Sequence, residues 1–143
     1  MKTINELQDE IIDEFSVFDD WMDKYSLLID MGRNLQPLDE SLKTPENRIE
    51  GCQSNVWLSA HMEGEHLQFV ADSDAVLVKG IVSVLVNILS GHTPEEILSA
   101  DLYCIDQIGL KEHLSPTRSN GLLAMVKQMK IYALAFQSKQ SNS

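Results

Sequence analysis

The spacing of apolar residues is the feature that most restricts how this chain folds. In residues 4–28 they recur every three or four positions, which is the period of a helix. Between residues 56 and 71 they tend to alternate, as expected for half-buried strands. Helical spacing then returns and continues to Phe136. This order of helices, a small sheet and further helices predicts an α+β fold.

Two helices are predicted at the start of the chain. Thr3 and Glu6 have the spacing of a capping box, in which each side chain satisfies a free backbone N–H group. A second apolar stripe begins at Trp21 and continues to Gly32, which we predict to be the C-cap. The polar faces of both helices are acidic, which indicates either a solvated surface or a site for a basic partner.

The middle of the chain predicts a small antiparallel sheet of about three strands. A first short strand, containing Arg48, enters a bend at Gly51 and Cys52. A second covers residues 56–62, and the sequence "EGEH" at residues 63–66 predicts a hairpin turn into the third.

Three helices are predicted after the sheet. The apolar segment that ends before Gly91 follows two candidate N-caps, Ser73 and Asp74. The sequence "TPEE" at residues 93–96 predicts a capped short helix with proline in its first turn. A last amphipathic helix is predicted from about Leu122 to Phe136.

The length of 143 residues is typical of one domain. No internal repeat or linker divides it, so we predict a single domain over residues 1–136. The polar end "QSKQSNS", residues 137–143, is predicted to be a disordered tail.

Charge and hydropathy exclude several classes of partner. The net charge of −11 disfavours binding to nucleic acid, because affinity for a phosphate backbone depends on Lys and Arg. The longest apolar stretch, residues 75–89, is broken by Lys79 and is shorter than the roughly 18 residues of a membrane span, so no membrane contact is expected. The N-terminus has no apolar secretory signal. Two cysteines fit a reducing compartment, although pairing between them stays open, and we expect the protein in the cytoplasm.

The motifs that bind common cofactors are absent from the sequence. It contains no Gly-rich phosphate loop, no His-Glu-x-x-His pair and no Cys-x-x-Cys pair. An iron–sulfur cluster needs about four ligands, mostly cysteines, and two cysteines do not supply them. A zinc site would have to combine scattered Cys and His residues without motif spacing. We therefore expect neither a metal nor a cofactor on this chain.

Cys52 is the candidate for chemistry. A free cysteine is either a small buried hydrophobe or, where cations or backbone dipoles favour the thiolate, a nucleophile. Gly51 permits a backbone bend beside Cys52, and Arg48 lies nearby in the sequence. Cys104 has apolar neighbours in "LYCIDQIGL", so a structural role is expected for it.

Several blocks of the sequence carry a resemblance to a known family. In order they are "NRIEGCQSNVWL", "ADSDAVLVKG", "TPEEIL" and "HLSPTRSNGLLAM". Together with "WMDKYSLLIDMG" they cover nearly the whole chain. In these blocks the chain resembles the SufE family of sulfur-acceptor proteins, which act with cysteine desulfurases in iron–sulfur cluster assembly.

The resemblance implies a fold and a function. The fold would be SufE/IscU-like, with a small antiparallel sheet packed by helices. Cys52 would accept sulfane sulfur from the persulfide of a pyridoxal-phosphate-dependent cysteine desulfurase, SufS-like or CsdA-like, and stimulate that enzyme. It would then pass the sulfur to an iron–sulfur assembly scaffold. The cofactor, PLP, is expected on the partner and none on this chain. A single cysteine in the motif fits a carrier better than a scaffold.

Five residues are expected to support Cys52: Gly51, Gln53, Asp74, Arg118 and Asn120. Asp74 either serves the site or only caps a helix. Arg118 either acts near Cys52 or at the partner surface, or it only anchors its loop. If Ser119 or Asn120 caps the last helix, Arg118 lies at the entrance of that helix.

Two further expectations concern Cys52. Because exposed thiolates and persulfides oxidise easily, we expect the sulfur to be shielded in the free protein and to move outward on the desulfurase. An alternative function is a thiol oxidoreductase or a cysteine hydrolase that uses Cys52. A hydrolase would need a histidine base, and no motif ties any of the four histidines to Cys52.

Overall fold

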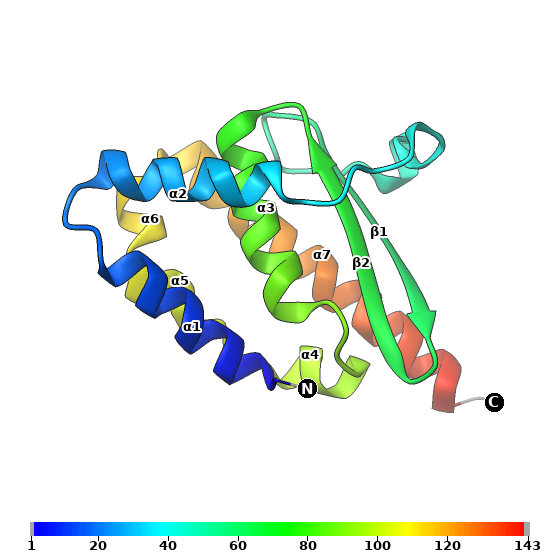
Figure 1. Ribbon diagram of the computed structural model, residues 1–143. Helices are drawn as coiled ribbons and strands as arrows, with labels where there is room; N and C mark the ends of the chain where they lie inside the picture. The colour runs from blue at the N-terminus through cyan, green and yellow to red at the C-terminus, as the bar shows by residue number, and fades with distance from the viewer. Residues whose placement is uncertain (1, 142–143) are drawn as a thin grey trace.

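The computed structural model describes residues 2–141 and confirms the α+β fold (Figure 1). In chain order its elements are α1 (Ile4–Ser16), α2 (Trp21–Arg33), the 3-10 turns η1 (Glu40–Leu42) and η2 (Pro45–Asn47), β1 (Val56–Glu63), β2 (His66–Ser73), α3 (Val76–Leu89), α4 (Pro94–Ser99), α5 (Tyr103–Ile108), α6 (Leu110–His113) and α7 (Pro116–Ser141). Figure 1 shows the hairpin of β1 and β2 along one side of the molecule and α1, α5 and α6 on the other.

Helix α3 is the centre of the core. Its side chains are apolar around most of its circumference, and it packs against α1, α2, α7 and β2. Burial on all sides is the arrangement expected of a helix without a wide polar face. Within residues 2–141 no helix is both long and apolar enough to span a membrane, since α3 has only 14 residues and the apolar residues of the 26-residue α7 alternate with polar and charged ones.

The sheet has two strands, so the prediction of about three is wrong in number. β1 and β2 pair antiparallel from Val56 opposite Ser73 to Glu63 opposite His66. The segment expected as a first strand makes only one bridge, between Arg48 and Trp57. Beyond it the chain leaves the sheet, because Gly51 has a φ of +91° and turns the backbone away.

The predicted capping boxes are confirmed. Thr3 and Glu6 cap α1 reciprocally, and Thr93 and Glu96 do the same for α4. These signals are local: each hydroxyl accepts a hydrogen bond from a backbone N–H three residues ahead, so neighbouring residues are sufficient to form them.

Gly32 is not the C-cap of α2, because the helix continues to Arg33 and Asn34 is its cap. Instead, Gly32 lies against α3. A Cβ atom on Gly32 would come within 2.8 Å of the backbone nitrogen of Gly80, and one on Gly80 within 2.2 Å of the carbonyl oxygen of Leu28. The two glycines therefore allow α2 and α3 to pack backbone to backbone.

Helix α7 is longer than predicted at both ends. It begins at Pro116, and the Ser115 hydroxyl accepts a hydrogen bond from the backbone N–H of Arg118 at 3.3 Å. Ser119 and Asn120 are therefore inside the helix and do not cap it. At the other end the helix continues to Ser141 through the expected tail, whose sequence contains no Gly or Pro to break it. Residues 142–143 lie outside the described residues.

Candidate functional site

Cys52 lies in the loop that joins the Arg48 bridge to β1. Two constraints require glycine at position 51. Its φ of +91° is in the left-handed region, and an added Cβ would be 3.3 Å from the Cβ of Ala124 on α7. The backbone at this point therefore approaches α7 closely and turns the next side chain, Cys52, against that helix.

The Cys52 sulfur is half-buried against the first turns of α7. Its thiol donates a hydrogen bond to the carbonyl oxygen of Gly121 at a sulfur–oxygen distance of 3.6 Å. Beside it is a cavity of about 80 Å³. The lining residues are Cys52, Gln53 and Ser54 from the loop, Val78 and Ile81 from α3, and Thr117, Arg118, Gly121 and Met125 from α7. Its buried side chains, Val78, Ile81 and Met125, are apolar, whereas Gln53, Ser54, Thr117 and Arg118 supply polar groups.

Gly121 is a part of the site that the sequence reasoning missed. A Cβ at this position would be 3.4 Å from the Cys52 sulfur, so the absence of a side chain leaves space beside the thiol. An isolated glycine in an otherwise helical pattern often has a packing or functional reason, so Gly121 could have been identified from the sequence in this way.

Two opposed effects act on the pKa of the Cys52 thiol. Burial raises the pKa, and the positive charge of Arg48 lowers it, with burial the larger effect. Because a free thiol already titrates above neutral pH, the free protein holds Cys52 mainly in the protonated form.

Of the five predicted supporting residues, three surround the thiol. Gly51 precedes it, and Gln53 and Arg118 line the cavity. Asn120 is exposed in α7 and does not line the cavity, so the structure does not bring it to Cys52.

Asp74 lies at the base of the loop and does not cap α3. The N-cap of that helix is Ala75, and the Ser73 hydroxyl accepts a hydrogen bond from its N–H at 3.2 Å. The Asp74 carboxylate accepts hydrogen bonds from the backbone N–H of Asn55 at 3.1 Å and from its side-chain amide at 2.8 Å. Asn55, which the sequence reasoning also missed, thus connects Asp74 to the loop.

Cys104 differs from Cys52 in burial and in surroundings. It is fully buried in α5, its backbone N–H donates to the side chain of Gln8 at 3.1 Å, and burial raises the pKa of its thiol to about 11. Both cysteines are free thiols.

The four histidines lie away from the Cys52 cavity, and within the described chain none of them lines it. His92 is buried and hydrogen-bonded to the carbonyl oxygen of Lys2 at 2.9 Å. The ring of His113 stacks on that of Trp21, with 3.9 Å between the ring centroids. His61 pairs with Glu63, with 3.3 Å between Nε2 and Oε1. Among residues 2–141 there is also no group of three or more His, Cys, Asp or Glu side chains placed to hold a metal.

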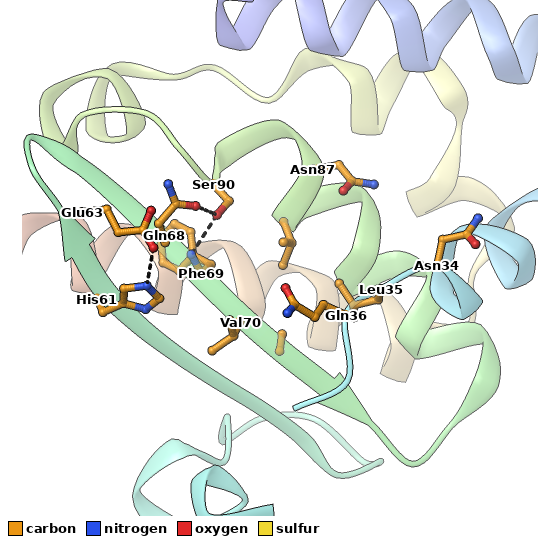
Figure 2. Close-up of a pocket in the computed structure, with 12 residues that line it drawn as sticks. Asn34, Leu35, Gln36, His61, Glu63, Gln68, Phe69, Val70, Asn87 and Ser90 are labelled. Carbon is orange, nitrogen blue, oxygen red and sulfur yellow. Dashed lines mark hydrogen bonds and ion pairs between the residues drawn. The ribbon is translucent and has the colours of Figure 1, made fainter. Parts of the chain in front are cut away.

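A second pocket, of about 430 Å³, lies between β2, the end of α3 and residues 34–36 (Figure 2). Some of its polar groups are paired with one another: the Ser90 hydroxyl accepts from the N–H of Phe69 at 2.9 Å and donates to Gln68 at 3.1 Å. It shares no residue with the Cys52 cavity and contains no cysteine.

The fold and the site together define a class: a small α+β domain that holds one loop cysteine over a small cavity between two helices. The SufE domain, described as an Fe-S metabolism associated domain, matches residues 9–133. The chain therefore belongs to the SufE family.

Relatives and a solved structure agree with this assignment. The chain is 43% identical over 127 residues to an uncharacterized SufE-like protein of Rhizobium etli, covering 85% of this chain and 86% of the relative. It is 42% identical to an uncharacterized SufE-like protein of Rhizobium meliloti, covering 85% and 91%. The solution structure of a hypothetical protein from Thermus thermophilus has the same fold, with a TM-score of 0.77 over 92% of this chain and 96% of that one, at 19% identity.

Proposed function

We propose that this protein is a sulfur carrier of iron–sulfur metabolism. Cys52 accepts sulfane sulfur as a persulfide from a PLP-dependent cysteine desulfurase, SufS-like or CsdA-like, and the protein stimulates that enzyme. It then passes the sulfur to an iron–sulfur assembly scaffold. The family and its association with Fe-S metabolism support the proposal. The single observation that carries it further is the position of Cys52, a free, half-buried thiol on a loop at the edge of a small cavity.

The chemistry is an exchange of the thiol–disulfide type. Cys52 first loses its proton to solvent, and the thiolate attacks the outer sulfur of the donor persulfide. A sulfur–sulfur bond forms on Cys52 as the bond within the donor breaks, and the desulfurase cysteine leaves as a thiolate. The oxidation level of the sulfane sulfur moves with it, so no external oxidant or reductant is consumed. The step uses no cofactor on this chain.

The loop is suited to hold Cys52 against α7 in the free protein and to expose it on the desulfurase. Thiolates and persulfides are oxidised when exposed, and Cys52 is half-buried beside a cavity whose buried side chains, Val78, Ile81 and Met125, are apolar. The hydrogen bond that holds the sulfur there, from the thiol to Gly121, is weak, because a thiol is a weak donor. An outward turn of the loop on the desulfurase would therefore cost little when this hydrogen bond is broken.

The alternative of a cysteine hydrolase lacks support from the site. A hydrolase needs a base within hydrogen-bond reach of its nucleophile, and none of the four histidines lines the cavity in the described chain. A dithiol oxidoreductase would need a resolving thiol, but Cys104 is fully buried in α5.

The test is to locate the transferred sulfur. After incubation with a cysteine desulfurase and cysteine, the peptide that contains Cys52 should gain about 32 Da, the mass of roughly one sulfur atom in the exchange. A Cys104→Ser protein should gain the same mass, and a Cys52→Ser protein should gain none. An adduct on Cys104, or one retained by the Cys52→Ser protein, would refute the proposal.

A further inference from the structure

We propose that the outer edge of β2, the edge that faces away from β1, is a second binding site. It takes an extended, uncharged peptide segment of a partner protein by strand addition. The site is the pocket between β2, the end of α3 and residues 34–36 (Figure 2). It shares no residue with the Cys52 cavity, so the inference goes beyond the proposed function.

The main-chain groups of β2 that point away from β1 belong to alternate residues. Leu67 identifies them, because its N–H donates to the carbonyl oxygen of His92 and its own carbonyl oxygen accepts from the N–H of Gly91, both at 2.8 Å. Outward-facing residues alternate along an antiparallel strand, so the main-chain groups of Phe69 and Ala71 point to the same side. The row of outward groups therefore continues past the segment that already pairs with Leu67.

Most of this continued row has no partner within the molecule. The Phe69 N–H donates to the Ser90 hydroxyl at 2.9 Å, as Figure 2 shows. Among residues 2–141, no hydrogen bond is made by the carbonyl oxygen of Phe69 or by the N–H and carbonyl groups of Ala71. Phe69 and Ala71 are only 3% and 1% exposed. Buried main-chain groups are nearly always paired in native proteins, so these three indicate a ligand that supplies the missing partners.

The three free groups identify the chemistry of that ligand. One donor and two acceptors lie along about 7 Å of strand, which is two steps of the chain. Another extended main chain presents donors and acceptors at the same spacing, and this match is the basis of peptide recognition by strand addition. The side-chain amides that line the same pocket can also bond to a peptide; they belong to Asn34, Gln36, Gln68 and Asn87.

The lining of the pocket favours an uncharged segment. The chain as a whole has a net charge of −11. In the described chain, however, the only ionisable side chains that line the pocket are His61 and Glu63, and these pair with each other. Leu35, Val70 and Val86 add apolar contacts for alternate side chains of the segment. A neutral strand with polar and small apolar side chains is therefore complementary to the site.

A second copy of this chain does not fit the site as well as a single segment does. Pairing of two β2 edges would require both to be accessible, but each lies inside its pocket with Phe69 and Ala71 almost fully covered. A single extended segment needs only the roughly 4.8 Å that separates neighbouring strands. The pocket, of about 430 Å³, offers space of this kind beside β2.

The outer edge of β1, by contrast, is covered by the chain itself. The carbonyl oxygen of Val56 accepts from the N–H of Ile49 at 2.8 Å, and that of Leu58 accepts from the Tyr132 hydroxyl at 3.2 Å. Edge strands without a partner are commonly protected by lysine, proline or a bulge. Residues 68–71, "QFVA", contain neither lysine nor proline, and they pair with β1 in regular register. The edge of β2 is thus free to accept another strand.

The experiment titrates nitrogen-15-labelled protein with the blocked peptide acetyl-Thr-Val-Ser-Val-Thr-amide and follows the backbone amides by NMR. The Ala71 amide signal should shift saturably, and its hydrogen exchange should slow at least about tenfold. Exchange of the Phe69 amide, which is already bonded to Ser90, should change little. The same peptide N-methylated at its three central residues should bind about tenfold or more weakly, because at least two main-chain hydrogen bonds are lost.

Val70→Lys and Ser59→Lys form a matched pair of variants. The two residues lie opposite each other in the register of β1 and β2, so both lysines are on the same face of the hairpin, but only Val70 lines the pocket. Val70→Lys should weaken peptide binding about fivefold, because apolar contact is lost. Ser59→Lys should bind the peptide as wild type does. Circular dichroism confirms that both variants are folded.

Three results would overturn the inference. If no peptide binds at millimolar concentration, water alone satisfies the free groups of Phe69 and Ala71. Equal binding of the unmodified and N-methylated peptides would mean that side chains make the contact, without strand addition. Signals of β2 that change with protein concentration in the absence of peptide would assign the edge to a second copy. The assay does not involve Cys52, so each result is independent of the test of the sulfur-carrier function.

Discussion

Cys52 and Cys104 are chemically the same side chain in two different surroundings. Cys104 is enclosed in α5, where burial raises the pKa of its thiol to about 11. Cys52 lies on a loop with one face against α7 and a cation at the base of the loop. A cysteine reacts only when it is accessible and can form a thiolate. Of the two cysteines, only Cys52 is partly accessible and has a cation near its thiol.

Shielding of Cys52 is testable with a bulky maleimide. In the native protein at neutral pH, Cys52 should react at least about tenfold more slowly than a small free thiol, because the loop must first open. Cys104 should remain unmodified until denaturant is added, when both thiols react at similar rates. If native Cys52 reacts as fast as the free thiol, the sulfur is not sheltered.

Arg118 lines the Cys52 cavity from the first turn of α7. Its backbone N–H is bonded to Ser115, and a cation at a helix N-terminus is slightly unfavourable. Arg118→Ala should therefore change the free energy of unfolding by less than about 0.5 kcal/mol while it lowers stimulation of a desulfurase. Arg118→Lys, which keeps the charge but loses the planar fork, should fall between wild type and Arg118→Ala.

Stimulation is measured per folded molecule, with chemical denaturation of each variant in parallel. If both Arg118 variants lose stability but their folded fraction stimulates fully, the residue only anchors the start of α7.

At the scale of elements, two buried helical glycines have different neighbours. Gly80 in α3 faces the backbone of α2, with the carbonyl oxygen of Leu28 only 2.2 Å from an added Cβ. Gly121 in α7 faces the Cys52 side chain, with 3.4 Å available. The first contact cannot relax without moving a helix, whereas the second is an ordinary van der Waals distance.

Alanine at these two positions should therefore have opposite effects. Gly80→Ala should destabilise the protein by about 3 kcal/mol, because overpacking forces α2 away from α3. Gly121→Ala should be neutral or stabilising by up to about 1 kcal/mol, since alanine is the better helix former. Urea denaturation of the two variants measures the difference, and equal losses would contradict the packing described for α2 and α3.

At the scale of the whole molecule, Asp72 connects three segments. Its carboxylate contacts Lys43, beside η1, at 3.3 Å and Lys79 in α3 at 3.2 Å, while Asp72 itself is in β2. Burial acts to raise the pKa of Asp72, but hydrogen bonds from the Ser73 N–H, Lys79 and Lys43 together hold it below its usual value. The folded protein therefore binds this proton less tightly than the unfolded chain does.

The stability that Asp72 contributes should depend on pH in a defined direction. It should be fully present above the unfolded pKa of about 3.9 and be lost as pH falls through the lower pKa of the folded state. The difference in unfolding free energy between wild type and Asp72→Asn should thus shrink below about pH 4. Urea denaturation at a series of pH values between about 3 and 7 measures it, and a constant difference would exclude this linkage.

The sequence by itself determined the features that depend on near neighbours. The capping boxes at Thr3 and Thr93 and the hairpin turn after Glu63 are confirmed, because each is made by hydrogen bonds within a few residues. The family blocks likewise identified the Cys52 loop, which lies where a single glycine turns the chain. These signals need no knowledge of what packs against them.

Only the tertiary structure decided which distant residues meet. Gly32 has the sequence signature of a C-cap, yet the approach of Gly80 determines its role. Cys52 and Gly121 are 69 residues apart, and Asp74 meets Asn55 only because β2 returns beside β1. Such contacts depend on how two distant segments pack against each other. The structural propensity of either segment alone therefore does not predict them.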